Sequence, residues 1–380
     1  MKIVSMEPTP SPYSMKVNVN EQLPDGQSAN YKLNDDVSDA PMYVQQLFDI
    51  HGVKGLFRVI DFITIERNPR VPWEEILPEV RKVLRTEDEG TDLFSKAAAA
   101  ESTADDSFGE INVFVQMFRN IPLQVKVRDG DNEQRFALPS RFTDIGMEAA
   151  MASDNYLTER KWVEQSPRYG EIEDIGHTIT EELAATHDEE RLAALLEFAL
   201  NENTEVKTQP KVTVTIDMLQ QDEWRDRYAA LAQMDPTESD YPVLEKALQD
   251  DNSSVRRLAT AYLGMIEEKE TLPYLYKALE DKSVNVRRTA GDCLSDLGFK
   301  EAMPHMMDTL SDKSRIVRWR AAMFLYELGD ESAIPSLETA LEDPEFEVRM
   351  QAKMALARIE SGQAAEGSIW HQMAQATEEK

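Results

Sequence analysis

The sequence predicts two small α+β domains followed by an all-α solenoid of 31-residue helical pairs. Three observations support this fold class. Seven columns of residues recur every 31 positions in the C-terminal third, apolar and polar residues alternate near the N-terminus, and an Asp-Gly step separates apolar runs in the middle. A chain of 380 residues also has the length of roughly two to three domains.

The repeat is defined by columns of one residue type at a constant spacing. The columns are Pro242, Pro273, Pro304 and Pro335; Leu248, Leu279, Leu310 and Leu341; Asp250, Asp281, Asp312 and Asp343; Val255, Val286, Val317 and Val348; Arg256, Arg287, Arg318 and Arg349; Ala259, Ala290, Ala321 and Ala352; and Leu263, Leu294, Leu325 and Leu356. Seven columns in register across four units indicate a repeat array, in which each unit depends on its neighbours for burial.

Each unit reads as helix A, a turn and helix B. The proline needs no partner for an N–H in a first helical turn, so helix A begins there, and the aspartate provides turn and cap chemistry. The Val, Ala and Leu columns of helix B are four residues apart and share one buried face. Gly298 and Gly329 fit left-handed C-caps that end helix B.

An incomplete unit precedes the array. The segment DEWRDRYAALAQM has a helix-B pattern without a proline-led helix A, and Trp224, Arg225 and Ala230 stand 31 residues before Val255, Arg256 and Ala261. We interpret this segment as an N-terminal cap. The aspartate turn followed by a Val-Arg step resembles the short bacterial HEAT-like repeats over residues 241–362, although HEAT units are usually ~40 to 47 residues long.

The recurrent arginines indicate a structural ladder, in which each reaches the aspartate of an adjacent turn, in preference to an anion-binding stripe. Residues that read a partner are expected instead in the column that varies from unit to unit. We call Arg257, Arg288, Trp319 and Met350 the variable column, and we add Arg320 because it flanks the tryptophan. Packing within the solenoid is the alternative for Trp319.

Residues 1–88 have the pattern of a small α+β layer. Glu7 to Pro12 is a turn-forming run, and Met15, Val17 and Val19 alternate with polar residues as in a half-buried strand. A helix is expected at about 40–50, two strands within 56–67 that bend near Asp61, and an amphipathic helix from Pro72.

The segments EPTPSPYSMK, LFDIHGVKGLF, DFITIER and WEEILPEV resemble the N-terminal domain of the Nfu/NifU-type iron-sulfur scaffold proteins. In that family a Cys-x-x-Cys pair in a separate domain holds the cluster, and this chain lacks such a pair. Its one cysteine, Cys293, cannot supply the four thiolates that a cluster usually needs, and we expect it to be a small buried apolar residue. The resemblance therefore implies a docking or regulatory role.

The remaining segments are assigned by composition and strand signals. We expect an acidic linker at 89–108, an α+β middle domain at 109–220, the repeats at 221–362 and a polar tail at 363–380. The middle domain has a hairpin signal at Asp129-Gly130 and helical stretches at about 141–153 and 179–202. The order of these parts resembles the conserved virulence factor C family, and that resemblance implies an accessory cytoplasmic protein.

Composition limits the partners and the chemistry. A net charge of -30 disfavours nucleic acid and anionic membranes, and the lack of a long apolar run favours a cytoplasmic protein. No catalytic motif is present. His177 with Glu181 has the spacing of a metal pair, but a solvated acidic helix face explains it better.

The sequence thus predicts a non-catalytic scaffold or adaptor without a cofactor. It would bind protein partners through the repeats, and the Nfu-like domain suggests that these are iron-sulfur biogenesis proteins or their clients. The alternatives are a carrier of iron or an iron-sulfur cluster with non-cysteine ligands or a shared Cys293, and an enzyme site in the middle domain.

Overall fold

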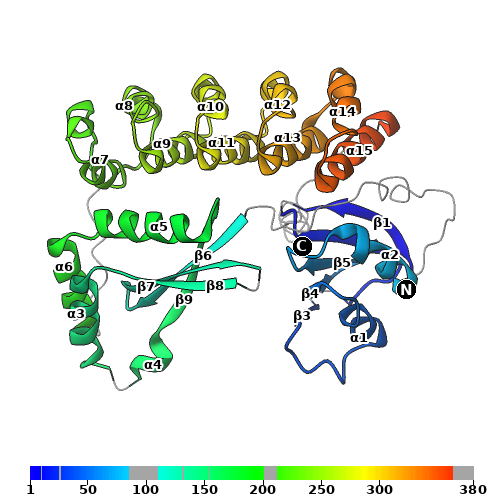
Figure 1. Ribbon diagram of the computed structural model, residues 1–380, viewed down its shortest axis with the longest axis horizontal. Helices are drawn as coiled ribbons and strands as arrows, with labels where there is room; N and C mark the ends of the chain where they lie inside the picture. The colour runs from blue at the N-terminus through cyan, green and yellow to red at the C-terminus, as the bar shows by residue number, and fades with distance from the viewer. Residues whose placement is uncertain are drawn as a thin grey trace. The chain divides into compact units, whose positions relative to one another are not determined.

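The computed structural model describes residues 1–9, 11–24, 27–84, 110–130, 132–153, 155–200 and 212–362 (Figure 1). The chain forms two compact units, which we describe separately. Unit 1 comprises Met1–Phe108 and Lys300–Lys380, and unit 2 comprises Gly109–Phe299. The Nfu-like domain therefore belongs with the last repeats, and the middle domain with the first. The predicted linker at 89–108 and tail at 363–380 lie outside the described residues.

The Nfu-like domain in unit 1 is a five-stranded antiparallel sheet with strand order β1-β2-β5-β4-β3 and two helices. Its elements are β1 (Ile3–Pro8), β2 (Ser14–Val19), β3 (Ser28–Lys32), α1 (Met42–Phe48), β4 (Val53–Val59), β5 (Phe62–Arg67) and α2 (Trp73–Leu84). Met15, Val17 and Val19 of β2 are buried against the inner face of α2. Four predicted features are confirmed: the strand at 15–19, which is β2, the two helices, and the strand pair that turns near Asp61.

Two strands of this sheet were not predicted. The expected turn at Glu7 to Pro12 begins too early, because β1 continues to Pro8 and pairs with β2. Strand β3 has alternating exposed and half-buried residues and no buried one, so it lacks the apolar face that marks a strand in sequence.

Unit 1 also contains the last two helical pairs. Their elements are η4 (Lys300–Ala302), α12 (Met303–Thr309), α13 (Arg315–Leu328), η5 (Glu331–Ala333), α14 (Ile334–Ala340) and α15 (Phe346–Ser361). Helices α13 and α15 pack side by side, and each also contacts its own helix A (Figure 1).

The middle domain in unit 2 is a four-stranded antiparallel sheet with strand order β8-β7-β6-β9 and helices packed mainly on one face. Its elements are β6 (Glu110–Phe118), β7 (Ile121–Asp129), β8 (Asn132–Ala137), α3 (Ser140–Ala150), α4 (Tyr156–Glu159), β9 (Lys161–Tyr169), α5 (Ile172–Thr186) and α6 (Glu189–Leu200). The hairpin between β7 and β8 is confirmed. Strand β9 was not predicted, because most of its residues are exposed and it shows no apolar alternation.

The single helical stretch expected at 179–202 is wrong. The chain leaves helical geometry at His187, and the Asp188 side chain accepts a hydrogen bond from the Arg191 backbone N–H at 2.8 Å, so a second helix begins there. The stretch is therefore two helices, α5 and α6.

The repeats of unit 2 begin with a cap and continue as two helical pairs. Their elements are η1 (Ile216–Gln220), α7 (Trp224–Leu231), η2 (Glu238–Asp240), α8 (Tyr241–Ala247), α9 (Ser253–Met265), η3 (Lys269–Thr271), α10 (Leu272–Leu279) and α11 (Val284–Leu297). The column prolines occupy the first turns of α8, α10, α12 and α14, as predicted. The all-α repeat region after two α+β domains confirms the predicted fold class.

The arginine-aspartate ladder is also confirmed. Arg256 Nε donates to Asp281 at 2.7 Å in unit 2, and Arg318 Nε donates to Asp343 at 2.6 Å in unit 1. Each aspartate also accepts the backbone N–H two residues ahead, at 2.7 Å for Asp281 and 2.8 Å for Asp343. One carboxylate therefore fixes the start of helix B and ties the arginine of the preceding helix B to it.

Two details of the predicted repeat are wrong. In the N-terminal cap, the ladder residue is Arg227, which pairs with Asp250 at 2.6 Å, whereas Arg225 pairs with Glu181 of α5. In this cap the short η1 stands where the other units have helix A. Gly298 has the expected left-handed conformation with φ of 68°, but Gly329 is extended with φ of -62°.

The ladder predicts a strong effect of one substitution. Arg256→Ala leaves Asp281 without its ion pair and removes two hydrogen bonds to the carbonyls of residues 250 and 251, so we expect unit 2 to lose about 2–4 kcal/mol of stability in urea unfolding. The control is Lys277→Ala, because the Lys277–Glu245 pair is exposed and solvent-screened, so its loss should leave the unfolding midpoint nearly unchanged. Equal losses in the two variants would contradict the ladder's role.

Candidate partner-binding face of the repeats

The first two residues of the variable column lie against the middle domain in unit 2. Arg257 of α9 is close to Glu182 of α5, with 3.9 Å between Nη2 and Oε2. The same carboxylate oxygen accepts a hydrogen bond from Arg168 at the end of β9, at 3.1 Å. The Arg168 and Glu182 side chains are both less than a tenth exposed. Two guanidinium groups therefore share one buried carboxylate where the middle domain meets the repeats.

This cluster of Arg168, Glu182 and Arg257 has incomplete hydrogen bonding. Burial lowers the pKa of Arg168, and the neighbouring Arg257 charge lowers it further, while Glu182 opposes both. Among the described residues, no hydrogen-bond partner reaches Glu182 Oε1 or the Nε atoms of the two arginines, although all three atoms are buried. A buried polar atom without a partner costs roughly 1–3 kcal/mol, so this interface is polar and imperfectly satisfied.

A second contact lies one repeat further along, at the start of α11. The Asn285 amide accepts a hydrogen bond from the backbone N–H of Tyr169 and donates one to its carbonyl, both at 2.8 Å. Arg288 stacks on the Tyr169 ring at 5.5 Å and pairs with Asp292. Burial raises the pKa of Glu110 on β6, an effect that the Arg288 charge opposes. The repeat thus holds the end of β9 through both backbone groups and the ring of Tyr169.

Met350, the last residue of the variable column, lies against the Nfu-like domain in unit 1. With Phe346 and Met354 of α15, it joins the apolar core formed by the Nfu-like sheet and by Trp73 and Leu77 of α2. A terminal repeat has no following unit to cover its apolar face. The Nfu-like domain covers that face and acts as the C-terminal cap of the array.

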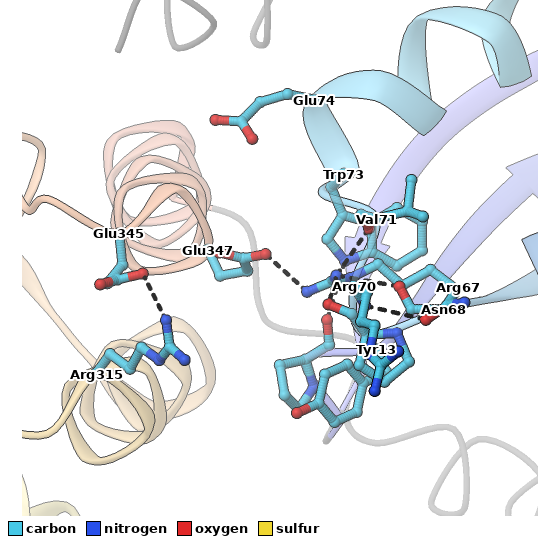
Figure 2. A network of polar contacts seen from close by, with 12 residues as sticks. Tyr13, Arg67, Asn68, Arg70, Val71, Trp73, Glu74, Arg315, Glu345 and Glu347 are labelled. Atoms are coloured by element: carbon cyan, nitrogen blue, oxygen red, sulfur yellow. Dashed lines mark hydrogen bonds and ion pairs between the residues drawn. The ribbon is translucent and has the colours of Figure 1, made fainter. Parts of the chain in front are cut away.

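A buried ion pair fixes this cap. Arg67, the last residue of β5, donates to Glu347 of α15 at 2.8 Å, and the two side chains are 1% and 9% exposed (Figure 2). Arg67 Nη1 also donates to the carbonyls of residues 68, 69 and 71, and its guanidinium stacks on the Tyr13 and Trp73 rings. Because Arg67 is held by its own domain before docking, it presents a preorganised charge to Glu347.

Glu74 at the start of α2 lies beside this ion pair and is 3.7 Å from Arg349 (Figure 2 shows Glu74 and Glu347). Burial raises the pKa of Glu74 to about 7, and the nearby Glu347 charge contributes, although Arg349 and Arg67 act in the opposite direction. The Glu74 side chain is 14% exposed. The contact between the Nfu-like domain and α15 therefore contains a carboxyl group that titrates near neutrality.

The residues predicted to bind a partner are therefore buried or in contact with other parts of the same chain. Arg257, Arg288 and Met350 contact the chain's own domains, and Trp319 and Arg320 of α13 are buried, at 2% and 5% exposure. Their use by a separate partner stays a prediction. Three residues that hold the domains against the repeats, Glu182, Asn285 and Arg67, were not predicted. Their partners are distant in sequence, and Arg67 and Glu347 are 280 positions apart.

His177, which was considered for metal binding, and a second histidine, His187, both lie in packing contacts. His177 contacts the Phe136 ring at 5.2 Å, and His187 is buried, which lowers its pKa to about 4 with a further contribution from Arg191. Cys293 is buried, as expected, with its thiol 3.6 Å from the Thr260 carbonyl. Within the described residues, no group of three potential metal ligands comes together, and no helix has the length and apolar character for a membrane span. The expectation of no cofactor and the alternative of bound iron or an iron-sulfur cluster both stay predictions.

Comparison with known proteins defines the class. Family models match at residues 4–89 (scaffold protein Nfu/NifU N terminal), 116–196 (virulence factor), and 212–290 and 272–357 (HEAT repeats). The chain is a HEAT-repeat protein with an Nfu-type N-terminal domain.

Two relatives define the family more closely. Protein YpgR of Bacillus subtilis is 52% identical over 276 residues, which cover 72% of this chain and 71% of that protein. Conserved virulence factor C of Staphylococcus saprophyticus is 42% identical over 275 residues, with 72% and 71% covered. This chain belongs to the conserved virulence factor C family. Among solved structures, Staphylococcus aureus protein SAV1430 is 34% identical with a TM-score of 0.21, and covers 22% of this chain and 98% of its own.

Glu74 predicts a pH dependence of unit 1. Because its folded pKa of about 7 exceeds the ordinary 4.5, the folded state binds the proton more tightly, and stability falls as pH rises from 4.5 to 7. Glu74→Gln should remove this part of the pH dependence, which we put at about 1–3 kcal/mol after allowing for partial exposure. Unfolding midpoints of both proteins at pH 5 and pH 8 measure it. Parallel shifts in the two proteins would refute the assignment.

The Asn285 contact predicts a local change in hydrogen exchange. Asn285→Ala removes the acceptor of the Tyr169 backbone N–H, so this amide should exchange at least about tenfold faster. Lys282→Ala, at an exposed position close to the start of the same helix, is the control and should leave this rate unchanged. An unchanged rate in Asn285→Ala would mean that β9 is not held by the repeat.

Proposed function

We propose that this chain is a non-catalytic adaptor whose repeats bind a protein partner with Arg257 and Arg288 of the variable column. The observation that carries the proposal is that Arg257 and Arg288 already contact a folded domain, the middle domain of the same chain. Charged side chains that bind a strand end and a helix in one domain have the chemistry to bind similar elements of another protein.

In the proposed binding, the partner replaces the middle domain on the repeats. The middle domain covers Arg257 and leaves buried polar atoms of the cluster without hydrogen bonds. A partner that supplies a carboxylate or carbonyl would accept a hydrogen bond from Arg257 Nε, which the middle domain leaves without one, and so compete with the middle domain. An interface that is mainly polar also loses less hydrophobic burial when it opens. These features support release of the middle domain as the step that admits a partner.

The Nfu-like domain suggests the pathway. Its resemblance to iron-sulfur scaffold proteins, with the matching family model at residues 4–89, supports the proposal that the partner is an iron-sulfur assembly protein or one of its clients. The domain is fixed to α15 through Arg67 and Glu347. In this proposal its role is docking and capping, and Cys293, whose thiol is buried against Thr260, takes no part in cluster chemistry.

Two variants test the exchange in opposite directions. Glu182→Gln weakens the hold on the middle domain without altering the array, so anaerobic crosslinking capture from cells of the source organism should recover more partner than wild type. Arg257→Ala removes a partner-reading residue and should recover less, and Lys277→Ala on an exposed helix-A face should match wild type. Far-ultraviolet circular dichroism verifies that each variant is folded.

The same experiment tests the pathway. Recovery of iron-sulfur assembly proteins or their clients supports that assignment, and recovery of an unrelated complex supports an adaptor with another purpose. If capture is equal in all four proteins, or if nothing is captured, the adaptor proposal fails.

A further inference from the structure

The middle-domain sheet has an open face that its helices do not use. Helices α3, α5 and α6 pack on the face formed by Ile111, Val113, Val125 and Val127. Alternation along the strands directs the intervening residues to the other face. The open sheet face, as we call it, comprises Phe114, Lys126, Arg128, Glu133, Arg135, Trp162 and Glu164. The strand register aligns Phe114 with both Lys126 and Glu164, and Lys126 with Arg135.

The open sheet face combines aromatic rings with cations. The Lys126 ammonium lies 4.5 Å from the Trp162 ring centre and 4.9 Å from that of Phe114. Arg135 lies over Trp162 at 5.7 Å, and Arg128 over Phe114 at 5.5 Å. The rings hold the three cations in place and so reduce the entropy cost of binding an anion.

One internal carboxylate shows what these cations bind. Glu133 accepts two hydrogen bonds from Arg135, at 2.9 and 3.0 Å, and is 3.5 Å from Lys126. The Arg135 hydrogen bonds hold the pKa of Glu133 below its ordinary value, and Lys126 adds to this effect. Arg128 is exposed and forms no ion pair with this carboxylate. The site therefore already accepts a carboxylate and has a further cation available.

We infer that the open sheet face binds an acidic, extended segment of another protein. Charge complementarity identifies the ligand, because three cations against the carboxylates of Glu133 and Glu164 leave this face positive on a chain with a net charge of -30. Nucleic acid is disfavoured, since the cations cover the ring faces on which bases would stack and the overall charge repels phosphate.

The sheet edge suits an extended ligand. Strand β9 ends the order β8-β7-β6-β9, so the side away from β6 has backbone groups that the sheet leaves unpaired. Most β9 side chains are exposed, and Trp162 carries the aromatic-cation cluster to this edge. A segment added along β9 would place alternate side chains on the open sheet face. The open sheet face contains no residue of the variable column, so this proposal can fail while the proposed function stands.

The test uses the full chain and a dye-labelled peptide of alternating glutamate and threonine. A peptide of about ten residues, at ~3.3 Å per residue, matches the length of β9. Fluorescence anisotropy measures its binding. Arg128→Gln and Arg135→Gln should each weaken binding about tenfold. Glu133→Gln removes the competing carboxylate and should strengthen it several-fold, a gain that misfolding cannot produce. Lys277→Gln on α10 is the control and should bind like wild type.

A single-stranded oligothymidine of similar length distinguishes the ligand class. Stronger binding of the oligothymidine than of the peptide, with the same response to Arg128→Gln, would overturn the acidic-peptide assignment in favour of nucleic acid. Absence of peptide binding, or binding that Glu133→Gln and Arg128→Gln leave unchanged, would overturn the site itself.

Discussion

Within each unit, the structure depends on the pairing of a helix-B arginine with the aspartate that precedes the next helix B. Arg256 with Asp281 and Arg318 with Asp343 show the same geometry in the two units, and Arg227 with Asp250 repeats it in the cap. A helical pair alone cannot bury its apolar face, so a fixed register between successive pairs is what allows the buried Val, Ala and Leu columns to meet. Residues that do not repeat are free of this constraint and available for other contacts.

The residues of helix B that do not repeat contact the α+β domains of the same chain. In unit 2 the contact is polar, with a carboxylate shared by two arginines and an amide that pairs with the end of a strand. In unit 1 it is a mixed contact, with an apolar core of Phe346, Met350 and Met354 beside the Arg67–Glu347 ion pair. Apolar burial favours permanence and a partly unsatisfied polar contact favours release, so we infer that the Nfu-like domain is the fixed cap and the middle domain the exchangeable one.

The fold could be predicted from the sequence wherever structure follows a local period. The 31-residue columns located the repeats, and the alternation of Met15, Val17 and Val19 located β2. Strands β3 and β9 escaped prediction because they are largely exposed and have no apolar alternation. The same reason explains the candidate site: the variable column was found by its departure from the repeat, but Glu182, Asn285 and Arg67 carry no local mark, since their roles arise only from tertiary contacts.

A photo-reactive amino acid at position 257, compared with one at position 277 on an exposed helix-A face, would test the central claim most directly. In the purified protein the account predicts crosslinks from position 257 to the α5 and β9 peptides of the same chain, and in cell extract it predicts that crosslinks to another protein replace them. Position 277 should show no such change. Crosslinks from position 257 that stay within the chain in extract, or that never reach α5 and β9, would contradict the account.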